Sequence, residues 1–171
     1  MCLTLFGFND KRGLSAVKNS YIFLTIRRSV MAKITKKELI ALLNKDLALE
    51  YTAIVQYTQH QGTLKGAMYQ NIQKELIIHA QEELQHATII AAQIDYLGGV
   101  PTVDTPPAKV SKDSLTMLKQ DLEGENDAIA RYSRRIRQAE ELDMYHLAQQ
   151  LRLILAMEQE HAMDLEQALG K

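Results

Sequence analysis

The chain has few of the residues that build covalent or sulfur-based scaffolds. It contains one cysteine, no tryptophan and three prolines among 171 residues. A single cysteine excludes a disulfide framework and a cysteine-based zinc or iron–sulfur site within one chain. A reducing compartment suits such a composition, so we expect the protein to be cytoplasmic.

A dominant charge and a long apolar run are missing as well. The chain has 20 basic and 21 acidic residues, so charge gives no reason to expect nucleic acid or an anionic membrane as the main partner. No apolar run approaches the ~20 residues that a membrane-spanning helix needs. The length suits one domain with a sizeable core.

The first 31 residues differ from the rest. They hold one acidic residue, Asp10, and a short apolar stretch at residues 21–26 that Arg27 and Arg28 end. That stretch is short for the core of a signal peptide. We predict that residues 1–31 are a disordered extension or the product of an upstream start site, with a targeting peptide as the alternative.

Residues 32–171 are predicted to form one helical domain, because apolar residues recur at helical spacing throughout. Thr35 and Glu38 match a capping box. The expected helices cover residues 36–61, 67–97, 114–140 and 143–169. Between the second and third lie about 16 proline-containing residues, which could span ~50 Å. The pattern therefore predicts an all-α four-helix bundle with one long crossover.

One pattern of Glu and Glu-x-x-His occurs twice in this domain. The two copies are Glu50, Glu83 and His86, and Glu125, Glu158 and His161. Every residue of the second copy lies 75 positions after its counterpart (125−50, 158−83 and 161−86). All six fall on the predicted apolar stripes, where buried carboxylates would need a cation. Exposed residues on amphipathic helices are the alternative, but the shared offset favours a dinuclear metal site.

Two tyrosines share the same offset. Tyr57 follows Glu50 by seven residues, and Tyr132 follows Glu125 in the same way. Packing in the core explains Tyr132 most simply. For Tyr57 two roles stay open, core packing and the supply of an electron near the metals.

Other polar residues have simpler expected roles. We predict that His79 is a hydrogen-bonded core histidine rather than a metal ligand, with support of the ligands or passage of iron as the alternative. His60 and His146, near helix ends, are predicted to lie on the surface. A solvated face or a subunit contact is the expected role of four arginines: Arg131, Arg134, Arg135 and Arg137.

Because of these residues, the chain resembles the ferritin-like superfamily, and bacterioferritin in particular, over about residues 36–168. Residues 50–57, Glu-Tyr-Thr-Ala-Ile-Val-Gln-Tyr, are similar to the helix A motif with its ferroxidase Glu and nearby Tyr. Residues 83–86 and 158–161 are similar to the two Glu-x-x-His ligand pairs, and residues 121–125 to the helix C segment that ends in a ligand Glu.

The resemblance implies a role for each ligand. Glu83 and Glu158 would bridge two iron ions. The terminal ligands would be Glu50 and His86 for one iron, and Glu125 and His161 for the other.

Two departures from the family pattern change the expectations. Leu84 stands where bacterioferritins carry the methionine that binds haem, so we predict no haem. The chain ends ten residues after His161, which leaves little room for the fifth helix of the large shells. We expect a homo-oligomer, a dimer or a cage, and the short end argues against 24 subunits.

The sequence therefore predicts a ferroxidase that binds two iron ions per chain and oxidises Fe(II) to Fe(III) with oxygen or hydrogen peroxide, with iron storage if a shell assembles. Oxygen-rich ligands with one imidazole per metal suit iron, and manganese is possible. One alternative is another di-metal redox enzyme, a manganese catalase or a rubrerythrin-like peroxidase. The other is a non-enzymatic, metal-stabilised bundle.

Overall fold

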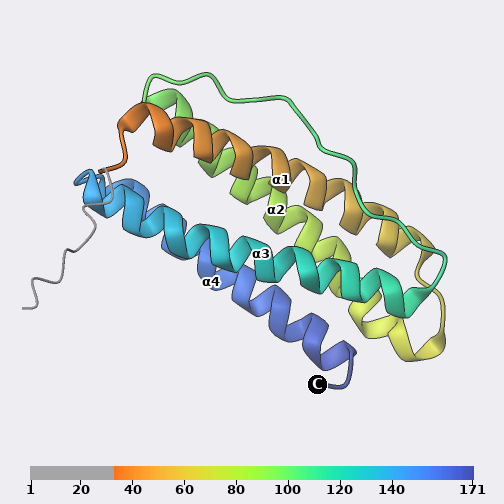
Figure 1. The fold of residues 1–171 in the computed structure, drawn as a ribbon. Helices are drawn as coiled ribbons and strands as arrows, with labels where there is room; N and C mark the ends of the chain where they lie inside the picture. Colours follow the sequence, from red (N-terminus) through yellow and green to blue (C-terminus); the bar gives the residue numbers. More distant parts are fainter. Residues whose placement is uncertain (1–32) are drawn as a thin grey trace, which may run out of the picture. The chain divides into compact units, whose positions relative to one another are not determined.

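The computed structural model describes residues 33–171, which fold as two antiparallel helical hairpins (Figure 1). The helices are α1 (Lys36–Thr63), α2 (Gln70–Tyr96), α3 (Ser114–Glu141) and α4 (Tyr145–Ala168), with a 3-10 turn at Ala67–Tyr69. The described residues contain no strand, and none of their helices is long and apolar enough to cross a membrane. The all-α bundle is as predicted. The predicted N-terminal extension lies outside the described residues and stays a prediction.

Local signals fix the helix ends. Thr35 caps α1, since its hydroxyl accepts from the backbone N–H of Glu38 while the Glu38 carboxylate accepts from that of Thr35. Asp113 caps α3 by accepting from the backbone N–H of Thr116 at 2.8 Å. Gly98 follows α2 with φ 81°, a left-handed conformation that glycine adopts at little cost.

The predicted helices differ from the observed ones in detail. The second helix begins at Gln70, because Ala67–Tyr69 form a 3-10 turn first. Leu115, near the start of α3, is 40% exposed, whereas Met117 and Leu118 on the same turn are 1% and 0% exposed.

The apolar core is divided into two parts along the bundle axis. One part includes Leu47, Ile90 and Ile154, and the other includes Leu76 and Leu122. On every helix the polar residues of the repeated pattern fall between the two parts. The fold therefore places a buried polar layer across the middle of the bundle.

The connection between α2 and α3 runs along α1, as predicted for a long crossover (Figure 1). Three α1 side chains, eight and four residues apart, hold it there. The Asn44 carboxamide accepts a hydrogen bond from the backbone N–H of Thr102 at 2.7 Å. The Gln56 carboxamide accepts one from the backbone N–H of Lys109 at 2.9 Å. Between them Thr52 donates to a crossover carbonyl at 2.9 Å.

Candidate metal centre

The six residues of the repeated pattern meet in the middle of the bundle, and none is more than 3% exposed. They form two overlapping groups, and within each group the candidate ligand atoms lie within 4.8 Å of one another. The groups are Glu50, Glu83, His86 and Glu158, and Glu83, Glu125, Glu158 and His161. Glu83 and Glu158 belong to both groups, and they are the residues predicted to bridge two metals.

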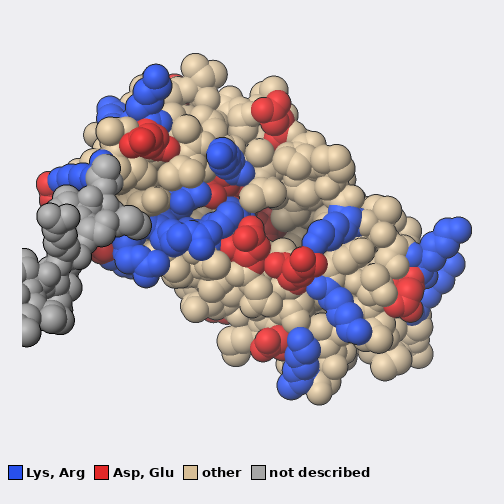
Figure 2. Space-filling view, in the orientation of Figure 1, with Lys and Arg blue, Asp and Glu red and all other residues tan. Residues whose placement is uncertain are grey.

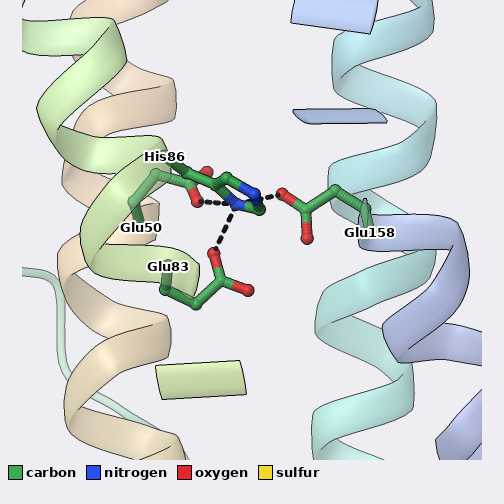
Figure 3. Close-up of side chains that lie close together, drawn as sticks. All are labelled: Glu50, Glu83, His86 and Glu158. Carbon is green, nitrogen blue, oxygen red and sulfur yellow. Dashed lines mark hydrogen bonds and ion pairs between the residues drawn. The ribbon is translucent and has the colours of Figure 1, made fainter. Parts of the chain in front are cut away.

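Figure 3 shows the first group around the imidazole of His86. Its Nδ1 lies 3.1 Å from Glu83 Oε2, 3.6 Å from Glu50 Oε2 and 3.3 Å from Glu158 Oε1. Glu158 comes from α4, on the opposite hairpin. One ring nitrogen thus faces carboxylates from three helices, as expected of neighbouring ligands of one ion.

The second group has the same form around His161. Its Nδ1 lies 3.2 Å from Glu83, 3.6 Å from Glu158 and 3.7 Å from Glu125. Its other nitrogen, Nε2, lies 2.8 Å from the Glu82 carboxylate on α2. A carboxylate behind a histidine fixes the orientation of the ring and makes the imidazole a stronger ligand.

Burial and neighbouring charges shift the pKa values of the residues in this cluster. Burial raises the pKa of Glu83 well above its usual range, and repulsion from Glu158 adds to the effect. Burial also raises the pKa of Glu125, to about 8. Burial alone would lower the pKa of His86, but the three carboxylates around its ring raise it to about 12. Cations must therefore displace protons when they enter.

Several polar atoms in the cluster lack a hydrogen-bond partner despite being buried. They are Glu50 Oε2, Glu83 Oε1, Glu125 Oε2, both carboxylate oxygens of Glu158 and His161 Nδ1. Leaving such atoms unpaired is costly in a protein interior. All are potential metal ligands, and the donor set of oxygens with one imidazole per group fits a pair of iron or manganese ions.

Two buried tyrosines cross-link the hairpins at this level. The Tyr57 hydroxyl on α1 donates to Glu125 on α3, and the Tyr132 hydroxyl on α3 donates to Glu50 on α1. Burial raises the pKa of both phenols well above the usual value, as do the nearby carboxylates. Both therefore remain protonated donors. Tyr132 has a hydrogen bond to a candidate ligand in addition to the predicted core packing.

Three predictions about polar residues were wrong. Arg135 is buried rather than solvated, and its Nε donates to buried Asp46 at 2.6 Å. Arg131 also donates to Asp46, at 3.0 Å, from a side chain that is 11% exposed. His60 is fully buried, with Nδ1 2.8 Å from Asp121. Being near a helix end does not expose His60, because it shares the inward face of α1 with Tyr57.

Asp46 and Asp121 were missed in the sequence although the repeat contains them. They are 75 positions apart, and each precedes a candidate ligand, Glu50 or Glu125, by four residues. Both are at most 2% exposed. The offset of 75 residues, applied to acidic residues one helical turn before a candidate ligand, would have found them.

The remaining sequence predictions concern the surroundings of the centre. His79 is a hydrogen-bonded core histidine as predicted, 2% exposed and 3.3 Å from Asp164. Its ring stacks on that of His161 at 4.1 Å between centroids. His146 is exposed, as predicted. Leu84 is 57% exposed on α2, and the absence of haem stays a prediction.

A cavity of about 350 Å³ leads to the centre between α1 and α3. Its inner wall includes Glu50 and Glu125, and Pro106, Pro107 and Lys109 of the crossover line it as well. Acidic and basic side chains are interspersed over the face that α1 and α3 present in Figure 2. Small solutes and ions thus have a route towards the polar layer.

Comparison with known proteins agrees with the fold. The family model described as ferritin-like domain matches residues 40–171. The chain is 32% identical over 138 residues to the bacterial ferritin of Paramagnetospirillum magnetotacticum, covering 79% of this chain and 84% of that relative. The chain therefore belongs to the ferritin-like family and is bacterioferritin-like.

Two solved structures are also similar. One is a ferritin-like, diiron-carboxylate protein from Bacillus anthracis str. Ames, with a TM-score of 0.75 and 35% identity, over 78% of this chain and 96% of that one. The other is a dodecameric thioferritin, the bacterioferritin-related protein from Bacteroides fragilis. Its TM-score is 0.74 at 34% identity, over 81% of this chain and 88% of that one.

Proposed function

We propose that this protein is a ferroxidase, which binds two Fe(II) ions in the bundle and oxidises them to Fe(III) with oxygen or hydrogen peroxide. The observation that carries the proposal is the pair of overlapping ligand groups that share Glu83 and Glu158. Shared carboxylates hold two metals close together, which allows both to react with one oxidant molecule. The diiron-carboxylate description of the Bacillus anthracis structure supports iron as the metal.

Each ligand has a distinct part in the proposal. Glu83 and Glu158 bridge the two ions, as their membership of both groups suggests. The terminal ligands are Glu50 and His86 for one ion, and Glu125 and His161 for the other. Oxygen-rich ligands stabilise the ferric product, and manganese could occupy the same donor set.

The buried surroundings also have a part in the reaction. Two Fe(II) ions supply two electrons, which reduce one O₂ to hydrogen peroxide with two protons, or one hydrogen peroxide to two waters with two protons. Tyr57 donates a hydrogen bond to Glu125. We propose that it can supply one of these two electrons in place of one Fe(II), losing its phenolic proton to become a tyrosyl radical that a further Fe(II) then reduces. The cavity between α1 and α3 is the proposed route for iron and oxidant.

We further propose that the chain acts as a homo-oligomer. The related Bacteroides fragilis protein is described as dodecameric. If this chain also forms a closed shell, the ferric product can be stored inside it, and the function extends from oxidation to iron storage and detoxification.

The test is the rate of Fe(II) oxidation by oxygen, followed by ferric absorbance in stopped flow. Glu83→Ala should abolish the fast phase, because it removes one ligand from both groups. Glu160→Ala changes an exposed glutamate on α4 and should react like the unmodified protein. Helical circular dichroism should be unchanged in both. Fast oxidation by a folded Glu83→Ala protein would overturn the assignment.

A further inference from the structure

The two ligand groups are alike in their donors but differ in the charges behind them. The offset of 75 residues pairs the residues around the centre: Asp46 with Asp121, Arg131 with Gln56, Arg135 with His60, Met157 with Glu82, and Ile154 with His79. The two aspartates are identical, whereas the other four pairs are not. The frame is thus nearly two-fold symmetric and its electrostatics are not.

Behind Glu50 lie two largely buried guanidinium groups. Asp46 is contacted by two guanidinium groups, Arg135 at 2.6 Å and Arg131 at 3.0 Å. Arg131 also donates to Asp127 at 2.9 Å, but that carboxylate is 60% exposed, so water weakens the pairing. Arg131 also lies 3.9 Å from Glu50 itself. A nearby permanent cation competes for this carboxylate and repels a divalent ion, in a site where water screens charges poorly.

Behind Glu125, the same position holds no permanent positive charge. Asp121 is contacted by the neutral carboxamide of Gln56 at 2.8 Å and by His60 at 2.8 Å. At most one positive charge, on His60, faces this carboxylate. A divalent ion next to Glu125 therefore meets less repulsion than one next to Glu50.

The Nε2 atoms of His161 and His86 also have different partners, and this difference again favours the position next to Glu125. His161 Nε2 lies 2.8 Å from the Glu82 carboxylate. The residue related to Glu82 is Met157, which offers no carboxylate, and His86 Nε2 has no hydrogen-bond partner within residues 33–171. The carboxylate behind His161 makes that imidazole the stronger ligand.

We propose that the two metal positions bind with unequal affinity, and that the position formed by Glu125 and His161 fills before the one formed by Glu50 and His86. Arg131 and Glu82 are the positioning residues that create the inequality, one by charge and the other through His161. The inference rests on the proposed dinuclear centre and adds an order of filling to it.

The test uses Zn²⁺ alone, which needs no oxidant, with the metal-free full-length chain. Crystals are prepared with one zinc ion per chain, and anomalous scattering at the zinc edge gives the occupancy of each position. We expect zinc mainly next to Glu125 and His161, in at least about a fivefold excess. Equal occupancies, or an excess next to Glu50, would overturn the inference. Absence of zinc from both positions would instead contradict the proposed centre itself.

Calorimetric titration with Zn²⁺ separates the two causes. Arg131→Gln should tighten the weaker step by about tenfold, since it copies the neutral Gln56 of the other half. Arg134→Gln, an exposed arginine on the same helix, is the matched control and should change neither step. Glu82→Gln should weaken only the tighter step.

If Arg131→Gln does not fold, Met157→Glu tests the inference separately, because a carboxylate behind His86 should tighten the weaker step. Unchanged affinities in the folded variants would contradict the proposed cause.

Discussion

The two hairpins of the bundle, α1–α2 and α3–α4, share one frame and differ in detail. In both, an aspartate, a glutamate and a tyrosine follow one another at intervals of four and seven residues, and a Glu-x-x-His lies on the next helix. The tyrosine of each hairpin donates to the glutamate of the other. The repeated residues define the centre, and those that do not repeat make its two halves unequal.

Packing and chemistry occupy separate parts of the bundle. Both parts of the apolar core contain residues of all four helices, so the centre lies between two packed blocks. Their burial supplies the hydrophobic stabilisation of the fold, which lets a costly polar layer persist between them. Such a layer is expected at a functional site rather than in a purely structural core.

The largest effects should come from the shared carboxylates, one on each hairpin. Glu83→Ala and Glu158→Ala should be equally damaging, with at least about a hundredfold loss of oxidation rate. Glu50→Ala removes a ligand from one group only, so it should leave one metal bound. Metal content after dialysis against Fe(II) without oxygen measures this difference. Full double occupancy in either shared-ligand variant would contradict the bridging role.

A large but unequal effect on stability is expected from the two aspartates. Asp46→Ala leaves two arginines without their buried partner and should lower the free energy of unfolding by about 3–5 kcal/mol. Asp121→Ala leaves His60 and Gln56 unpaired and should cost about 1–3 kcal/mol. Urea denaturation of the metal-free variants gives both values. Equal losses of unfolding free energy in the two variants would mean that pairing with two arginines adds no stability beyond that of the Asp121 contacts.

The pH dependence of stability should reveal Glu125. Burial raises its pKa from 4.5 to about 8 in the folded protein. Its contribution is therefore fully present below pH 4.5 and is lost as the pH rises through about 8. Metal-free Glu125→Gln, which cannot ionise, should lose less stability than the unmodified protein over this range, by about 1–3 kcal/mol. The control is Glu123→Gln, which changes an exposed glutamate on the same helix. An identical pH profile of stability for all three proteins would refute the raised pKa of Glu125.

The smallest effects should come from the tyrosines. Tyr57→Phe and Tyr132→Phe each remove one hydrogen bond to a candidate ligand. We expect Tyr57→Phe to slow oxidation by about tenfold, a barrier change of about 1.4 kcal/mol. In electron paramagnetic resonance the unmodified protein should show a tyrosyl radical during oxidation, and Tyr57→Phe should lose this signal. Tyr132→Phe should keep that signal. Identical behaviour of the two variants would limit Tyr57 to its hydrogen bond.

Much of the fold and the location of the centre were predictable from the sequence. Helical periodicity, the capping box and the proline-containing connection carry local information, and the repeat places six candidate ligands on inward faces. The wrong predictions concern His60, Arg131 and Arg135, whose burial depends on partners 61, 85 and 89 residues away. Such pairings follow from helix packing, which no single segment encodes.

The most direct test of the account is an anaerobic Fe(II) titration of the metal-free protein, followed by oxygen and a count of the iron oxidised per chain. The two ligand groups predict that binding saturates at two Fe(II) per chain and that both ions are oxidised rapidly. Further uptake beyond two would indicate a storage shell. Saturation at one ion, or binding of two ions that oxygen and hydrogen peroxide both leave ferrous, would contradict a dinuclear ferroxidase centre.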